Sequence, residues 1–350
     1  MFRIFDKIDK NEVYVIAEMS ANHGGSLENA LEIVRQAAKA GADCLKIQTY
    51  TADSLTIDCD NEYFRIHGGL WDGYKLYDLY IDAATPYEWN GIIKEECEKC
   101  GIDFLSTPFD FQSADYLEEL GVEAYKIASF EFNDVPFIEY VAKKGKPMIM
   151  SCGMASEVEI LDAIEACRRV GNENIVLLKC CSEYPANWED LHLGNIPDMR
   201  DRFGIHVGLS DHSFGSLGAV VAVSLGACVI EKHVKLEGVD SPDSEFSMTM
   251  DEFARMVQDV KNAKKVAAGP DYTLTPKELS STAFRRSLFA VKDIYAGEII
   301  TAENVRSIRP GNGAPPKYLP LILGKKSPKE LQRGDPVTIE MIIDMISKTN

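Results

Sequence analysis

Eight short apolar segments recur between residues 13 and 233, and most are followed by a stretch whose apolar residues return at helical spacing. Repeated strand-then-helix units favour a parallel sheet covered by helices. We expect the strands at 13–19, 44–49, 103–108, 124–129, 147–151, 174–181, 205–212 and 228–233. Eight such units close a barrel, which takes about 250 residues. The sequence therefore predicts an α/β protein in which residues 1–268 form a TIM (β/α)₈ barrel.

An open, doubly wound sheet is the alternative arrangement of the same units. Such a sheet normally carries a glycine-rich phosphate-binding loop after an early strand. The segment here is AEMSANHGG, which contains neither GxGxxG nor GxxxxGK[ST]. This difference favours the closed barrel.

Residues 50–84 form a long, aromatic-rich connection between the second expected strand and its helix. Connections of this length in compact domains tend to be functional. The helix that follows is expected to begin with Thr85 as its N-cap, Pro86 in the first helical position and Glu88 completing a capping box.

The barrel pattern stops after residue 268. Residues 269–283 are expected to be a linker, of which about a dozen extended residues would span ~40 Å. Residues 284–350 then show short strands and glycine turns, which predict a small, mostly-β domain.

Charge and composition narrow the class of protein. The net charge of -18 disfavours a general binder of nucleic acid or of anionic membranes. No apolar run approaches the ~20 residues of a membrane span, and the N-terminal segment lacks the pattern of a signal peptide. The nine cysteines are an odd number and most of them lie inside apolar segments, so we expect free thiols and a cytoplasmic location.

Polar residues cluster where the expected strands end, and active sites of such barrels lie at the carboxyl ends of the strands. The residues concerned are Glu18, Asn22, His23, Lys46, Gln48, Ser106, Thr107, Lys126, Ser129, Lys179, Ser182, Ser210, His212, Glu231 and His233. Burying an unpaired lysine is costly, so several lysines here predict a bound anion. The alternative is that a lysine pairs with a barrel carboxylate such as Glu231.

A small substrate with phosphate and carboxylate groups suits five of these residues. Lysines act on phosphate as point charges, and hydroxyls donate hydrogen bonds to its oxygens. The five are Lys46, Thr107, Lys126, Ser129 and Ser210.

His212 and His233 are expected at the ends of adjacent strands. Two imidazoles so placed suit a divalent metal with open positions for substrate and water. Two protein ligands are too few for a structural zinc site, so the expected ion is catalytic and exchangeable.

Ordered motifs extend over nearly the whole chain. They are AEMSANHGGS, AGADCLKIQTY, FLSTPFD, AYKIASFE, LKCCSEYP, GLSDHS and EKHVKLE, followed by RPGNG. On these motifs the chain resembles the sialic acid synthase family. The segment GGLWDGYKLYDLYIDAATPYEW (68–89) and SPDSEFSM are similar to those of its pseudaminic acid branch. The resemblance implies that residues 284–350 are an antifreeze-like (SAF) domain.

The resemblance also implies an activity. Phosphoenolpyruvate would condense with open-chain 2,4-diacetamido-2,4,6-trideoxy-L-altrose to give pseudaminic acid and phosphate, with Mn²⁺, Mg²⁺ or Co²⁺ on His212 and His233. It implies phosphoenolpyruvate contacts for Lys46, Thr107, Lys126, Ser129, Ser182 and Ser210, and sugar contacts for Glu18, Gln48, Tyr184 and Asp243. Glu18 and Glu231 are alternatives for the group that handles protons. It implies a homodimer in which the SAF domain covers the partner's barrel and Arg309 reaches the partner's sugar; the alternative for Arg309 is an ordinary turn residue.

Three other functions stay open on the sequence. The same chemistry could act on N-acetylmannosamine or on the legionaminic acid precursor. A sugar-binding protein without activity would not need both histidines and the set of lysines. An enzyme acting on phosphorylated sugars would need further basic residues for the second phosphate.

Overall fold

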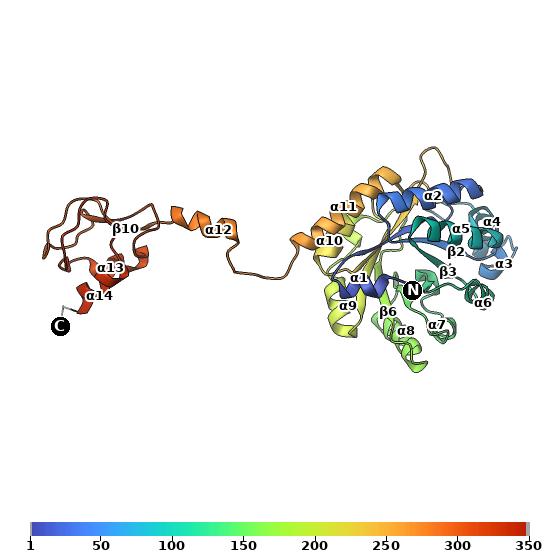
Figure 1. Cartoon of the computed structure of the whole chain (residues 1–350). Coiled ribbons are helices and arrows are strands. Elements are labelled where there is room, and N and C mark those ends of the chain that lie inside the picture. The colour runs from blue at the N-terminus through green and yellow to red at the C-terminus, as the bar shows by residue number, and fades with distance from the viewer. Residues whose placement is uncertain (1, 348–350) are drawn as a thin grey trace. The chain divides into compact units, whose positions relative to one another are not determined.

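The computed structural model describes residues 2–347, which divide into two compact units between Ala268 and Gly269. Each unit has its own buried apolar cluster. Figure 1 shows the first unit as strands surrounded by helices.

All eight expected strands are present, with bounds within two residues of those predicted. They are β1 Tyr14–Glu18, β2 Cys44–Thr49, β3 Asp103–Pro108, β4 Tyr125–Ile127, β5 Met148–Ser151, β6 Ile175–Cys180, β7 His206–Asp211 and β8 Val229–Lys235. The ladder order is β3-β2-β1-β8-β7-β6-β5-β4, with every pair parallel, and its two ends β3 and β4 contact each other. The predicted (β/α)₈ barrel is confirmed.

The outer helices are α2 Leu27–Ala40, α5 Tyr87–Cys100, α6 Phe111–Glu119, α7 Val135–Ala142, α8 Glu157–Arg169, α9 Asn195–Phe203, α10 Leu217–Ser224 and α11 Met250–Val266. Local sequence fixes several of their ends. Ser156 and Glu159 form a reciprocal capping box at the start of α8, and Thr249 and Glu252 do so at α11. Helix α2 ends at Gly41, whose φ of 91° suits glycine.

Two apolar layers hold the barrel. One lies between strands and helices, and the other fills the inside of the barrel. Helix α1 (Ile4–Asp9) contributes Phe2 from its leading segment and its own Ile4 to the inner layer. Beside it, the Tyr14 hydroxyl donates to Asp103 Oδ2 at 2.6 Å and Arg3 Nε donates to Oδ1 at 2.8 Å. These contacts close the amino-terminal end of the barrel.

The connection between β2 and α5 is less irregular than expected. It contains α3 (Ala52–Leu55), a 3₁₀ turn at Glu62–Phe64 and α4 (Leu76–Ala83). The predicted cap of α5 is wrong, because Pro86 occupies the N-cap position and no side chain caps the helix. Thr85 is buried, and its hydroxyl lies 3.2 Å from His23 Nε2. The Thr85 hydroxyl is therefore engaged with His23 and does not cap helix α5.

The second unit has a compact core and little regular structure. It contains α12 Pro276–Ser281, β10 Ser287–Ala290, β11 Val305–Ile308, α13 Leu319–Ile322 and α14 Ile339–Ser347. The two strands are antiparallel, and isolated bridges such as Ile294 to Leu331 extend the β structure. Helix α12 lies inside the expected linker, because Thr275 and Glu278 form a capping box around Pro276. The irregular stretch before it, 267–275, would span ~30 Å when extended.

Among residues 2–347, no helix is long and apolar enough to cross a bilayer.

The inner apolar layer predicts a stability effect at α1. Replacing the fully buried Ile4 by Ala should lower the free energy of unfolding by about 2–4 kcal/mol, since it removes apolar contacts and leaves a cavity. Urea unfolding followed by circular dichroism measures this loss. Ile57→Ala is the control, because Ile57 is 59% exposed and should change stability by no more than about 0.5 kcal/mol. Equal effects of the two variants would show that α1 does not seal the barrel.

Candidate active site

Side chains that alternate with the inner apolar layer form a polar ring at the carboxyl ends of the strands. Successive residues of a strand face opposite sides, so Glu18 follows Ile16 into the barrel and Lys46 follows Cys44. By the same alternation the ring contains Glu18, Lys46, Gln48, Thr107, Lys126, Ser151, Cys180, Ser210, Glu231 and His233. The inner apolar layer lies on the amino-terminal side of this ring, and the barrel mouth lies on its other side.

Two lysines and two glutamates form a buried cluster in this ring. Lys46 Nζ lies 2.9 Å from Glu18 Oε2 and 3.4 Å from Glu231 Oε1. Lys126 Nζ lies 4.0 Å from Glu231 Oε2 and donates to Ser151 Oγ at 2.7 Å. The alternative of an internal ion pair thus applies to Lys46 and much less to Lys126.

Burial and neighbouring charges shift the pKa values of these four residues in different directions. Burial lowers the pKa of Lys126. Lys46 is equally buried, yet its two carboxylate neighbours outweigh burial and raise its pKa. Burial raises the pKa of Glu18 although Lys46 opposes it, whereas for Glu231 burial is outweighed by Lys126 and Lys46, which lower its pKa. Glu18 is therefore the carboxyl of the two that takes up a proton more readily.

Hydrogen bonds link this cluster to neighbouring polar residues. Gln48 Nε2 donates to Glu18 Oε1 at 3.0 Å and to Ser20 Oγ at 2.9 Å. Ser210 Oγ donates to Glu231 Oε1 at 3.1 Å. Asp243 is half-buried, and its loss of hydration raises its pKa, while Ser20 donates a hydrogen bond that favours its ionised form. These residues surround one side of the cluster.

The two histidines lie together beside the cluster, with ring centroids 5.4 Å apart. His212 Nδ1 lies 2.8 Å from the carbonyl oxygen of Cys181, which can only accept, so Nδ1 carries the proton and Nε2 points elsewhere. His233 is buried, which holds its pKa well below the usual range, and its Nδ1 has no hydrogen-bond partner. Among the described residues, no three His, Cys, Asp or Glu side chains are arranged to hold a metal.

Cys180 is a polar-ring residue that the sequence did not single out for the substrate site. Its Sγ lies 3.8 Å from both His212 Nδ1 and Ser182 Oγ. Burial opposes ionisation of this thiol, but His212 and hydrogen bonds from Ser129 and Ser182 lower its pKa to about 7. Cys180, Ser129 and Ser182 therefore meet at the ends of β4 and β6, and Ser129 Oγ also accepts from Gly153 N at 3.2 Å.

Aromatic side chains lie next to the histidines. The Tyr184 ring is 4.3 Å from that of His212 and 5.1 Å from that of Phe246. Trp71, from the long connection, lies 5.7 Å from Tyr184, and its Nε1 donates to the carbonyl of Pro242 at 3.1 Å. This connection is thereby tied to the segment that carries Asp243.

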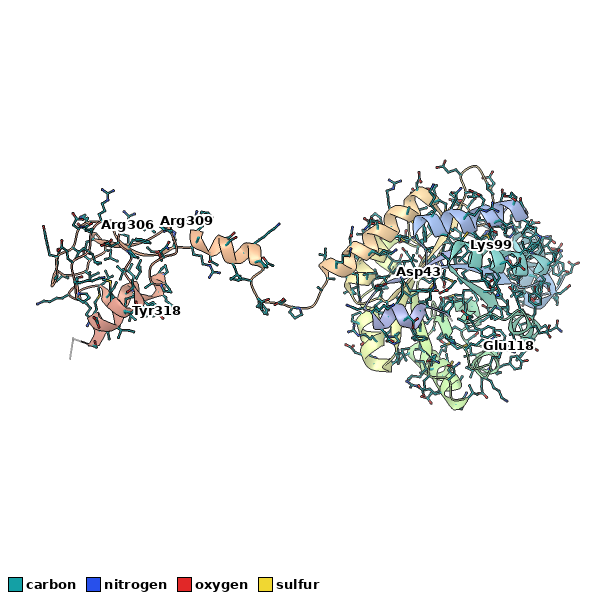
Figure 2. The ribbon with its side chains drawn as sticks, viewed as in Figure 1. Asp43, Lys99, Glu118, Arg306, Arg309 and Tyr318 are labelled. Carbon is teal, nitrogen blue, oxygen red and sulfur yellow. The ribbon has the colours of Figure 1, made fainter. Side chains whose placement is uncertain are left out.

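Two residues expected at the strand ends face the helices instead. Ser106 Oγ bonds to Thr49 Oγ1 at 2.6 Å, and Lys179 Nζ donates to the carbonyl of Cys180 at 2.8 Å. Each lies next to an inward residue, Thr107 or Cys180, and neighbours on a strand cannot share a face. Arg309 belongs to the second unit, where it is exposed directly after β11 (Figure 2).

Glu131 is a further candidate that the sequence did not reveal. It follows β4 in a 3₁₀ turn, and its Oε2 is buried without a hydrogen-bond partner. Burial raises its pKa to about 7. The motif AYKIASFE contains this residue, but no pattern in the sequence distinguishes a buried glutamate from a solvated one.

Known proteins match both units. A sequence model of the NeuB family matches residues 33–271, and one of the SAF domain matches residues 285–343. The chain is 48% identical over 325 residues to a pseudaminic acid synthase of Campylobacter jejuni, covering 93% of this chain and 95% of that protein. It is 41% identical over 330 residues to the pseudaminic acid synthase of Helicobacter pylori, covering 94% and 97%.

A solved structure shares the fold. The crystal structure of the N-acetylneuraminic acid synthetase of Leptospira borgpetersenii, in complex with citrate, superposes with a TM-score of 0.69 at 31% identity. The match covers 77% of this chain and 90% of that one. With a barrel, a C-terminal domain and full-length relatives all in agreement, the chain belongs to the NeuB family.

Proposed function

We propose that this protein is a pseudaminic acid synthase. The methylene carbon of phosphoenolpyruvate forms a bond to the aldehyde carbon of 2,4-diacetamido-2,4,6-trideoxy-L-altrose, water adds to the neighbouring carbon, and its bond to the phosphate oxygen breaks. The products are pseudaminic acid and inorganic phosphate. The buried ring of charged groups at the carboxyl ends of the strands supports this chemistry. The two relatives named pseudaminic acid synthase are 48% and 41% identical to this chain, whereas the N-acetylneuraminic acid synthetase is 31% identical.

The anion is proposed to bind next to Lys126. This lysine is buried, and its nearest carboxylate oxygen is 4.0 Å away, so its charge is only partly compensated. Thr107 Oγ1 is buried without a partner, and Ser129 and Ser182 meet near Cys180. Phosphate oxygens would accept hydrogen bonds from such donors.

A divalent ion fits the residues present. The bond from His212 Nδ1 to a backbone carbonyl is the arrangement that orients metal-bound imidazoles, and His233 is buried in its neutral form. Two carboxylates and two ammonium groups of the cluster cancel, whereas phosphoenolpyruvate carries about three negative charges. A dication held by His212 and His233 would offset much of that excess and supply Lewis-acid polarisation of the sugar's carbonyl oxygen. The candidate ions are Mn²⁺, Mg²⁺ and Co²⁺.

The protein's own groups would orient the reactants and handle protons. Gln48, Tyr184 and Asp243 surround the space beside the cluster and are proposed to bind the sugar. Glu18 is the preferred proton-handling group over Glu231, because its pKa is raised and it contacts Gln48. Burial of the ring keeps bulk solvent away from the reactants.

A sugar panel tests the proposal. The purified chain with Mn²⁺ and phosphoenolpyruvate should convert the altrose derivative at a kcat/KM at least ~100-fold above that for N-acetylmannosamine or the legionaminic precursor, because a buried polar site discriminates strongly between sugars. Mass spectrometry of the acid and phosphate release, in equal amounts, measure turnover. Chelation should stop it without unfolding the chain, and His233→Ala should not respond to added metal. Preference for another sugar would change the assignment, and no phosphate release from any sugar at saturating metal would indicate a non-catalytic binder.

The two lysines should respond differently to substitution by Met. Lys126→Met should raise KM for phosphoenolpyruvate at least ~10-fold while thermal stability holds, because it removes a buried cation that is poorly compensated. Lys46→Met should lower stability by about 3–5 kcal/mol, because Glu18 and Glu231 lose their partner. Steady-state kinetics and thermal unfolding of both variants measure the contrast. A stable Lys46→Met protein beside an unfolded Lys126→Met protein would reverse the two roles.

We also propose a homodimer in which Arg309 of each chain acts at the partner's barrel. The residue is exposed in the SAF domain, and the resemblance to the family supports an exchanged arrangement. Its guanidinium would donate to an acetamido carbonyl of the sugar.

Subunit mixing decides whether Arg309 acts in trans. Arg309→Ala chains and His212→Ala chains should each be weak or inactive, whereas an equal mixture should recover about a quarter of wild-type activity, since half the dimers then hold one intact site. Arg306→Ala, on the same domain (Figure 2), is the control and should stay active alone. If subunits exchange and no activity returns, the trans arrangement is wrong.

A further inference from the structure

Two buried charged residues lie directly beside the two histidines but face away from them. Asp211 precedes His212 and Lys232 precedes His233, and the two are register partners in the ladder of β7 and β8. They are 0% and 1% exposed. Because neighbours on a strand face opposite sides, this pair lies between the barrel and its helices.

Asp211 and Lys232 also bond to Ser213, the residue that follows His212. Lys232 Nζ lies 2.9 Å from Asp211 Oδ2 and also donates to the carbonyl oxygen of Ser213. Asp211 Oδ1 accepts from Ser213 N at 2.9 Å and from Ser213 Oγ at 2.7 Å. The residues on both sides of His212 are thus fixed to the residue that precedes His233.

Helix α10 closes over the pair. A Cβ atom on Gly218 would lie 3.3 Å from Asp211 Oδ2 and 3.1 Å from Ser213 Oγ, so a larger residue would crowd both. The absence of a side chain there allows the helix to pack tightly and keep water from the ion pair.

Stability alone does not require charges at this position. One step earlier on the same face, the ladder pairs Leu209 with Ile230, both buried in the apolar layer. Replacing a buried ion pair by apolar residues is often neutral or stabilising. Stability therefore does not explain why Asp211 and Lys232 are charged. A role in fixing the geometry of the two strands does explain it.

We propose that Asp211 and Lys232 are positioning residues that set the separation and orientation of His212 and His233. The pair connects the two strands one residue before each histidine. Two imidazoles can share one ion only if their nitrogens converge, and partners outside the ligand shell commonly tune metal affinity by 10–100-fold. This inference rests on the metal site of the proposed function.

Binding of Mn²⁺ without substrates tests it, in the full-length Asp211→Leu/Lys232→Met protein. Removing both charges avoids an unpaired buried ion but leaves the N–H and carbonyl of Ser213 without these partners, so the variant should remain folded with a melting temperature a few degrees below that of the wild type. Its Kd for Mn²⁺, measured by titration calorimetry, should rise at least ~10-fold. Asp103→Asn is the control: it removes a partly buried charge at the opposite end of the barrel, where Tyr14 and Arg3 contact it, and should leave the Kd unchanged.

The outcomes separate this inference from the proposed function. If the wild type binds Mn²⁺ and the double variant binds it equally well, the positioning role is wrong while the metal site stands. If the wild type does not bind Mn²⁺, the metal site fails and the positioning role with it. Should the double variant not fold, Ser213→Ala removes only the 2.7 Å bond to Asp211 and should raise the Kd about threefold; an unchanged Kd there would equally overturn the proposal.

Discussion

The buried cluster of Lys46, Glu18, Glu231 and Lys126 is the constraint on which the rest of the barrel mouth depends. Such groups are tolerated inside a protein only when each charge has a partner. The cluster meets this condition closely for Lys46 and only in part for Lys126. It spans β1, β2, β4 and β8, so most of its members come from strands that are far apart in sequence. The closed barrel is what brings them together, and any loss of register would separate them.

This balance also explains how a strongly acidic protein can accept an anionic substrate. The overall charge of -18 is spread over the surface, where salt screens it, whereas the substrate would experience the local field of the mouth. At the mouth, the two lysines differ in how closely carboxylates approach them. Lys46 is held between two carboxylates, and Lys126 has a hydroxyl and a carbonyl as its nearer partners. Lys46 therefore stabilises the cluster, whereas the charge of Lys126 remains available for an anion.

The fold could be predicted from the sequence because strand position depends on local pattern. Apolar runs and helical periodicity located every strand of the barrel, and the polar strand ends located its mouth. What failed was decided by tertiary contacts. The sequence does not tell which of Ser106 and Thr107 faces inward, since only the barrel fixes the phase of the alternation. Thr85 had the sequence of a helix cap but bonds to His23, and Glu131 gave no signal because its burial comes from the surrounding fold.

Strands β7 and β8 carry a buried ion pair in register on their outer face, near their carboxyl ends. A parallel strand is normally apolar on both faces, because it lies between the inside of the barrel and a helix. Here Ser210 and His212 face one side and Asp211 the other, and Glu231 and His233 stand in the same relation to Lys232. Polar residues on the inner face are required by any chemistry in the mouth, but they make the carboxyl ends of the strands poor at packing. An ion pair in register on the outer face restores a fixed connection between the strands that apolar contacts, being non-directional, would not provide. The polar outer face of these two strands is therefore a consequence of the polar site on their inner face.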